Sequence, residues 1–137
     1  MAHWLMKSEP SAYSWDQLIK DRRTNWNGVR NYQAANNLKA MQPGDRAFFY
    51  HSNEGLAVVG IVEIVKSAYP DPADKTGRFV MVDVKPVMAL TKPVTLAAIK
   101  AEPKLKNLPL VKQSRLSVSP VSAEEWQLIC KMGGVKA

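Results

Sequence analysis

The sequence has very few of the residues that build metal sites or disulfides. Among its 137 residues there is one cysteine, Cys130, and there are two histidines, His3 and His51. No CxxC or HxxxH spacing occurs, and a structural zinc site needs several converging ligands of this kind, so we expect no metal and no cofactor. A single cysteine cannot form an internal disulfide, which fits a reducing compartment such as the cytoplasm.

The sequence also lacks the motifs of common catalytic and membrane proteins. It has no GxxxxGK or GxGxxG phosphate loop and no GxSxG nucleophile turn, which excludes a standard kinase or hydrolase. Charged Lys7 and Glu9 interrupt the N-terminal segment, so it has no signal-peptide form. The longest apolar run, Leu56–Val65, is too short to span a bilayer. We therefore expect a cytoplasmic protein without membrane association.

Positive charge is what the sequence has in excess. Lysine and arginine number 19 against 12 aspartate and glutamate residues, which gives a formal net charge of +7. Such a charge attracts polyanions and speeds their encounter with the protein. Nucleic acid is therefore a candidate partner, although charge alone does not define a binding site.

The pattern of apolar residues predicts one α+β domain over residues 1–137. Segments rich in aromatic and β-branched residues predict strands at Trp4–Lys7, Arg46–Ser52, Gly55–Val65, Phe79–Pro86 and Arg115–Pro120. Helices are expected to begin after the capping residues Ser14, Thr95 and Ser122, and another near Asn31. The strands are expected to form a small, mostly antiparallel β-barrel, closed or nearly closed, with helices around it.

Three local features carry more detailed expectations. Ser14 with Gln17 and Ser122 with Glu125 have the spacing of capping boxes. Gly60, in the middle of a strand, predicts a bulge or the close approach of another backbone. Cys130 lies on the apolar stripe of the last predicted helix, which indicates a buried thiol rather than a nucleophile.

The four tryptophans do not have equivalent surroundings. Trp15 and Trp126 lie on apolar helical stripes and Trp4 begins a strand, so all three are expected in the core. Trp26 instead stands in a polar loop before a helix, close to Gly28, which permits a tight turn. Its ring either folds back into the core or stacks on a flat ligand, and the pattern alone leaves both alternatives open.

Several polar residues are candidates for a site. Lys7 and Glu9 are two residues apart at a strand end, with Ser8 between them, so their side chains are expected on one side. Arg115 and Ser117 alternate with apolar residues and so form a polar strand face, where arginine suits a phosphate or a base edge. Each group also has a structural explanation, a solvated strand edge or an ion pair, and both explanations stay open.

Four motifs together resemble the EVE-domain family along essentially the whole chain. They are "WLMKSEP" (Trp4–Pro10), "WNGVRNYQAANNL" (Trp26–Leu38), "GDRAFFYHS" (Gly44–Ser52) and "RLSVSPV" (Arg115–Val121). The resemblance implies a PUA-like fold, a small β-barrel with peripheral helices. EVE domains are similar to YTH domains, which hold a methylated adenine of RNA in an aromatic cage. The implied function is therefore non-catalytic recognition of a modified base in DNA or RNA.

The resemblance also implies roles for individual residues. Trp26 would stack on the base, with Ser8 and Glu9 beside the base edge. The other implied ligand-binding residues are Val29, Asn31 and Tyr32 at the helix entrance, His51 and Ser52 at the mouth, and Arg115 and Ser117 opposite. Phosphate contacts are expected from Lys7, Arg30 and Arg115. The loop Ala73–Arg78 is short, with only Tyr69 and Phe79 flanking it, so we expect a single stacking wall rather than a full cage.

Other functions stay open at this point. The chain could be an enzyme similar to ASCH-type hydrolases of modified nucleosides, with Lys7 and Glu9 as a base and acid pair. It could also be an RNA-binding accessory protein without base specificity. An aromatic cage for a methylated cation on a protein is disfavoured by the net charge of +7. We expect a monomer, and we expect Trp26→Ala to abolish binding with little change in melting temperature.

Overall fold

The computed structural model describes residues 2–53 and 55–136. These residues form one sheet in the order β2-β5-β4-β3-β1-β6. Its strands are β1 (His3–Ser8), β2 (Thr24–Asn25), β3 (Arg46–His51), β4 (Ala57–Pro70), β5 (Val80–Thr95) and β6 (Val118–Val121). The helices are α1 (Trp15–Asp21), α2 (Tyr32–Ala40), α3 (Leu96–Ala101), the 3-10 helix η1 (Pro103–Leu105), α4 (Pro109–Lys112) and α5 (Ala123–Met132). Within these ranges no helix has the length and apolar character needed to cross a membrane.

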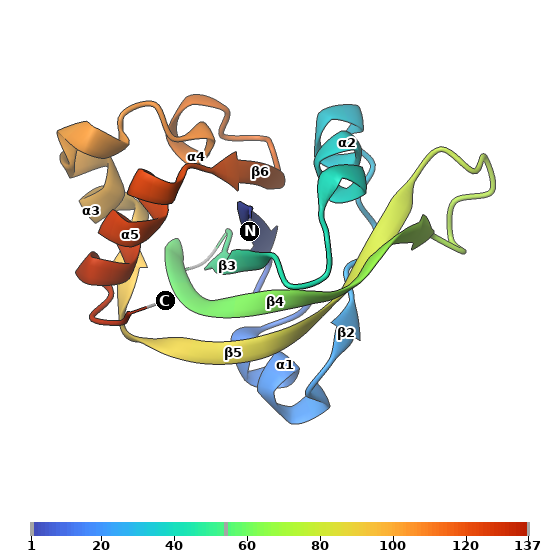
Figure 1. Ribbon diagram of the computed structural model, residues 1–137, viewed down its shortest axis with the longest axis horizontal. Coiled ribbons are helices and arrows are strands. Elements are labelled where there is room, and N and C mark those ends of the chain that lie inside the picture. The colour runs from blue at the N-terminus through green and yellow to red at the C-terminus, as the bar shows by residue number, and fades with distance from the viewer. Residues whose placement is uncertain (1, 54, 137) are drawn as a thin grey trace.

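The sheet is mixed and curved but not closed. β4 and β5 form a long antiparallel hairpin, while β1 runs parallel to β3 and antiparallel to β6. The sheet bends around the centre of the molecule, as Figure 1 shows. Its edge strands β2 and β6 do not pair with each other in the described chain. The α+β class is thus confirmed, and the expected closure of the barrel is wrong, since β2, with only two residues, is too short to complete it.

Strands β1 and β3 separate two hydrophobic clusters. Trp4 and Phe49 belong to the first cluster, which also receives side chains from α1 and α2. Leu5 and Phe48 belong to the second, which receives side chains from α3, α4 and α5. In Figure 1 the latter three helices gather at one end of the sheet, with α2 at the other. Neighbouring residues on a strand face opposite sides, so burial on both sides explains the unbroken apolar run "AFFY".

Gly60 lies at the close approach that the sequence predicts. The register of β4 against β5 shifts between Val58 and Gly60, as expected for a bulge. A Cβ atom at Gly60 would lie 2.5 Å from the ring of Trp15, a separation that no real side chain tolerates. The prediction of a bulge is confirmed, but what approaches Gly60 is the indole of α1 rather than another backbone.

The two predicted capping boxes form to different extents, one fully at α5 and one by half at α1. The reciprocal box is present at α5, where Ser122 accepts from the Glu125 amide and Glu125 accepts from the Ser122 amide. At α1 only half of the box forms, because Ser14 accepts from the Gln17 amide while the Gln17 side chain donates to Asp21 at 3.0 Å. Asp21 lies one turn further along α1, so its carboxylate competes with the Ser14 backbone for the side chain of Gln17.

Strand lengths are where the sequence pattern was least accurate. β4 continues to Pro70 and β5 to Thr95, so both are longer than predicted. β5 even includes Pro86, which lies beside a shift in the register with β4, a place where a missing N–H is tolerated. The last strand begins at Val118 rather than Arg115. The predicted turn at Asn53 and Glu54 lies partly outside the described residues.

Candidate functional site: a hollow beside Trp26

The loop that carries Trp26 is fixed to the sheet at two points. Trp26 directly follows β2, and its N–H donates to the Val82 carbonyl at 2.7 Å. Two residues later Gly28 adopts a φ of +80°, a conformation that side chains with a Cβ rarely adopt. The Gly28 N–H then donates to Asp71 Oδ2 at 2.9 Å. The glycine that the sequence pattern singled out is therefore the turn that leads the chain into α2.

Asp71 holds this loop against the end of the β4–β5 hairpin. The carboxylate is buried and accepts hydrogen bonds from the Gly28 and Ala73 amides and from Arg30, the last at 3.1 Å. The Gly28 amide is the largest influence that lowers the pKa of Asp71, in opposition to burial, and the Ala73 amide and Arg30 lower it further. Asp71 therefore stays ionised at neutral pH, and the loop keeps its anchor.

The surroundings of Trp26 combine both alternatives that the sequence leaves open. The residue is only 8% exposed and belongs to the first hydrophobic cluster. Its ring meets Phe49 edge-on, with centroids 5.5 Å apart and planes at 88°. Trp26 nevertheless borders a hollow of about 480 Å³. The residue is thus a core residue at the edge of an open space, and that space has the volume of typical small-molecule sites.

Four of the predicted site residues meet at this hollow: Lys7, Ser8, Glu9 and Trp26. The other residues that line it are Ala12, Tyr13, Thr24, Asn25, Asn27 and Gly28, none of which the sequence pattern singled out as a ligand contact. Most of these new members are polar. The structure therefore places two asparagine side chains and a tyrosine next to the residues predicted for the base edge.

Hydrogen bonds hold the polar rim of the hollow in place. The Lys7 Nζ donates to the Ser114 carbonyl at 2.8 Å, and burial lowers the pKa of Lys7. Ser8 Oγ donates to the Tyr13 carbonyl at 2.6 Å. The Tyr13 hydroxyl in turn donates to Asp21 at 2.8 Å. A rim fixed in this way keeps its donors and acceptors oriented before any ligand arrives.

Three other predicted residues lie near the hollow without lining it. Val29 is 6% exposed and packs in the first cluster. Asn31 caps α2 by accepting from the Ala34 amide at 2.9 Å. Ser117, which precedes β6, accepts from the Lys7 N–H through its carbonyl at 2.9 Å. The described contacts of these three residues are structural.

Arg115 borders a second, separate hollow. Asn31, Gln33 and Lys112 share that hollow with it. Arg115 is exposed and precedes β6, so the predicted polar strand face at this position is wrong. The segment to which it belongs is nevertheless tied to the first hollow, because the Ser114 carbonyl accepts from Lys7.

His51 and Ser52 do not line the hollow. His51 Nε2 accepts from the Trp15 N–H at 3.1 Å, which requires a neutral imidazole, and burial lowers the pKa of His51 accordingly. The Ser52 N–H donates to the Ser8 carbonyl at 2.9 Å. These contacts attach α1 and the end of β1 to the end of β3, so His51 and Ser52 support the residues that line the hollow.

The last two predicted residues, Arg30 and Tyr32, lie on the outer side of the loop. Arg30 forms its ion pair with Asp71 at 3.1 Å. Tyr32 is 62% exposed and contacts Phe79 rather than the hollow. Trp26 and Tyr13 are the aromatic residues that line the hollow, so the single stacking wall expected from the short hairpin loop stays a prediction.

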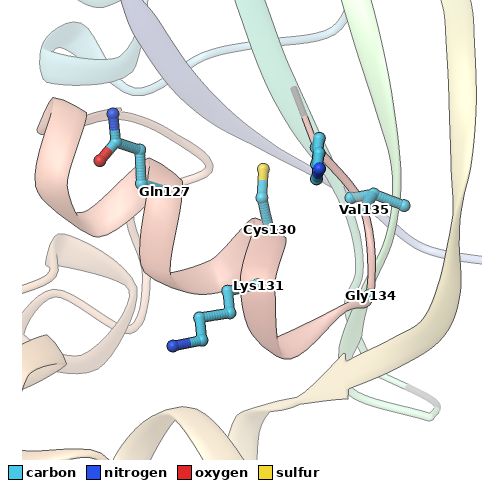
Figure 2. A pocket seen from close by; sticks show the side chains of 6 residues that line it. Gln127, Cys130, Lys131, Gly134 and Val135 are labelled. Atoms are coloured by element: carbon cyan, nitrogen blue, oxygen red, sulfur yellow. The ribbon is translucent and has the colours of Figure 1, made fainter.

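A further hollow borders α5 and the segment that follows it, shown in Figure 2. Gln127, Cys130 and Lys131 come from the helix, and the Cys130 and Lys131 side chains point in different directions. Cys130 is 3% exposed, and burial raises the pKa of its thiol to about 11. The thiol is therefore protonated at neutral pH, which confirms the prediction of a buried structural cysteine. Among the described residues no group of three or more His, Cys, Asp or Glu side chains gathers as a metal site would require.

The curved mixed sheet and its flanking helices define an α+β domain. A comparison with family models places the chain more narrowly. The chain belongs to the EVE domain family, whose model matches residues 2–132. The resemblance carried by the four sequence motifs is thereby confirmed.

Individual proteins agree with this assignment. The NMR structure of Rpa0253 from Rhodopseudomonas palustris is 58% identical, with a TM-score of 0.93 over 98% of this chain and 94% of that chain. Human thymocyte nuclear protein 1 is 36% identical over 165 aligned positions, which cover 96% of this chain and 73% of that protein. A crystal structure of human THYN1 protein in complex with 5-methylcytosine containing DNA is 34% identical, with a TM-score of 0.92 over 100% of both chains.

A more distant structure shares the fold alone. It is the YTH domain of the Zygosaccharomyces rouxii MRB1 protein in complex with N6-methyladenosine RNA, with a TM-score of 0.61 over 99% of this chain and 89% of that chain. Sequence identity is 16%, so this likeness concerns the arrangement of the elements. The expected similarity between EVE and YTH domains is confirmed at that level.

Proposed function

We propose that this domain is a non-catalytic reader that holds a modified nucleobase of DNA or RNA in the hollow beside Trp26. The observation that carries the proposal is the combination of an indole and several fixed polar groups around one open space. A similar structure supports it, since the human THYN1 protein was determined in complex with 5-methylcytosine containing DNA.

The hollow offers the two kinds of contact that a base requires. Trp26 supplies an aromatic surface, and stacking on a base contributes roughly 1–3 kcal/mol. Asn25 and Asn27 carry side-chain amides that donate and accept, as the edges of bases do. A base inside a duplex cannot reach such a space, so the ligand would be a flipped or single-stranded nucleotide.

Phosphates of the same strand would meet the positive charge of the protein. We assign this role to Lys7 and Arg115. Lys7 donates a hydrogen bond to the carbonyl of Ser114, the residue that precedes Arg115. Arg30 contributes less, because its guanidinium already pairs with Asp71 at 3.1 Å. Binding that involves phosphate neutralisation weakens steeply as the salt concentration rises.

The test is a comparison of modified and plain ligands. 5-Methyldeoxycytidine, N6-methyladenosine and their unmodified forms, alone and within single strands, would be titrated while tryptophan fluorescence is recorded. We expect tighter binding of at least one modified form, and loss of that preference in Asn27→Ala, whose exposed position leaves the fold intact. Gln127→Ala, on the distant hollow of α5, is the matched control. Equal binding of modified and plain strands would instead indicate an unspecific RNA-binding protein.

An enzymatic function has one observation in its favour. Lys7 and Glu9 line the same hollow, and burial lowers the pKa of Lys7 toward the range of a general base. Incubation with modified nucleosides followed by mass analysis separates the two functions. Turnover by the wild type that disappears in Lys7→Ala would replace the reader proposal with a hydrolase.

We extend the proposal to the setting in which the domain works. The net charge of +7 and the single cysteine favour a monomer that meets nucleic acid in the cytoplasm. Light scattering of the purified protein, with and without an oligonucleotide, measures the oligomeric state. A dimer in the absence of ligand would contradict this part of the proposal.

A further inference from the structure

We infer that Tyr32 and Phe79 form a second contact surface, on which an unpaired base next to the one in the Trp26 hollow stacks. The inference rests on the proposed function insofar as the ligand is a strand rather than a free nucleoside. We call this surface, made of Tyr32, Phe79, Arg30 and Arg78, the outer platform.

The two rings of the outer platform come from separate parts of the chain. Tyr32 is the first residue of α2, and Phe79 precedes β5 at the end of the hairpin loop. Their centroids lie 5.4 Å apart with planes inclined at 33°. Tyr32 is 62% exposed, which makes it a large, mostly uncovered aromatic side chain on the surface. A side chain of this type in this position buries far more surface with a partner than without one.

Two arginines border the rings of the outer platform, beside the Asp71 and Asp74 carboxylates, which accept from Arg30 and from the Phe79 N–H, respectively. The Arg30 guanidinium lies 5.4 Å from the Phe79 ring centroid, and Arg78 Nη1 donates to the Tyr32 hydroxyl at 3.2 Å. Asp71 neutralises Arg30, whereas Arg78 has no ion pair among the described residues. The exposed Tyr32 ring beside arginine suits single-stranded nucleic acid, since a base can stack on the ring and a phosphate can meet the guanidinium.

The outer platform and the Trp26 hollow are fixed relative to each other. Asp71 accepts from the Gly28 amide, which lines the hollow, and from Arg30, which covers Phe79. Only Asn27 to Asn31 separate Trp26 from Tyr32 in the sequence. A strand whose modified base enters the hollow would therefore pass the rigid loop and offer its next base to the outer platform.

The experiment uses the full chain with three probes. They are 5-methyldeoxycytidine alone, a single strand of roughly ten nucleotides that contains one 5-methylcytosine, and the same strand unmodified. Tyr32→Ala removes the exposed ring and Arg78→Gln removes the free charge. Ile19→Ala is the matched control, because it truncates another exposed apolar side chain, 47% exposed, on a different helix.

We expect Tyr32→Ala to weaken binding of both strands by roughly tenfold or more, the effect of stacking one base, and to leave binding of the nucleoside unchanged. Arg78→Gln should weaken strand binding by a smaller factor and reduce its salt dependence. Strand binding by Tyr32→Ala equal to that of the Ile19→Ala control would overturn the inference.

The two proposals fail in distinguishable ways. Loss of the modified-base preference in Asn27→Ala, together with an inert Tyr32→Ala, would keep the reader function and overturn the outer platform. The absence of any preference in the wild type, together with strand binding that depends on Tyr32, would do the reverse. A wild-type protein that binds neither these strands nor single strands that contain N6-methyladenosine would overturn both.

Discussion

The two hydrophobic clusters contain tryptophans with contrasting surroundings. Trp126 in the second cluster is 1% exposed and is stacked against Phe48 at 3.9 Å and His3 at 4.4 Å. Trp26 in the first cluster is 8% exposed, meets Phe49 only edge-on and borders a hollow. The Trp126 ring is thus covered by side chains of the protein itself, whereas Trp26 borders a space that a partner could fill. We therefore expect the larger contribution to stability from Trp126, and we propose Trp26 as the place of recognition.

The largest expected effect is on Trp126. Trp126→Ala should lower the free energy of unfolding by about 3–5 kcal/mol, because it empties a fully packed site. Trp26→Ala should fall at the low end of this range, near ~3 kcal/mol, since the hollow already adjoins the ring. Urea denaturation measures both values. A larger loss for Trp26→Ala than for Trp126→Ala would contradict the contrast between the clusters.

This expectation corrects one made from the sequence. A Trp26 ring on a polar loop suggested that Trp26→Ala would leave the melting temperature nearly unchanged. The ring is instead 8% exposed within the first cluster, so its removal creates a cavity. Binding and stability must therefore be separated with variants that keep the core filled, such as Trp26→Phe.

The next largest effect is expected for Gly60→Ala, which tests how tightly the first cluster is packed around Trp15. Gly60→Ala places a Cβ atom against the Trp15 ring, where 2.5 Å is available. Overpacking of this kind lowers the free energy of unfolding by about 1–3 kcal/mol. Thermal denaturation measures the loss. A neutral Gly60→Ala would show that Trp15 shifts freely, and this part of the first cluster would then not be tightly packed.

A pH experiment examines the anchor of the Trp26 loop. Because the folded protein lowers the pKa of Asp71 below its ordinary value of 3.8, the stabilisation is complete above that value and is lost as the pH falls through the lower, folded value. Asp71→Asn should reduce the free energy of unfolding by about 1.5–3 kcal/mol at pH 7, the contribution of hydrogen bonds to a charged group. The difference from wild type should shrink below pH 3.8. A difference that stays constant through this range would contradict the role of the carboxylate.

The smallest losses of stability are expected from removing the helix caps Ser122 of α5 and Ser14 of α1. Ser122→Ala disrupts a reciprocal box, whereas Ser14→Ala removes a single side-chain hydrogen bond. Each should lower the free energy of unfolding by about 1 kcal/mol, with the larger loss at Ser122. Differential scanning calorimetry can resolve the pair. A larger loss at Ser14 would indicate that α1 depends on its cap more than on Trp15.

The sequence predicted local features of the fold well and distant pairings poorly. The start of α2 near Asn31 and the cap at Thr95 follow from nearby residues, and both are confirmed. The length of β5 was missed because Pro86 reads as a strand end unless the register of β4 is known. The missing closure of the sheet likewise depends on β2, which has no apolar pattern of its own.

The candidate site shows the same limit. Trp26, Ser8 and Glu9 were found from unusual residues in conspicuous places, and the structure brings them to one hollow. Tyr13 and Asn25 were missed because they reach that hollow through the folding of α1 and β2 against β5, which no local spacing records. The side-chain amides of Asn25 and Asn27, on either side of Trp26 in the sequence, were the one feature that could have indicated further polar contacts. Tyr32 was placed in the pocket, although the hairpin end draws it outward to Phe79.

The central claim is that the hollow beside Trp26 selects a modified base. The most direct measurement is isothermal titration of the wild type and Trp26→Phe with matched single strands, one with and one without a modified base. We predict that the wild type prefers the modified strand and that Trp26→Phe, still folded, loses most of this preference, because a smaller ring provides less stacking surface. An undiminished preference in a folded Trp26→Phe would contradict the account.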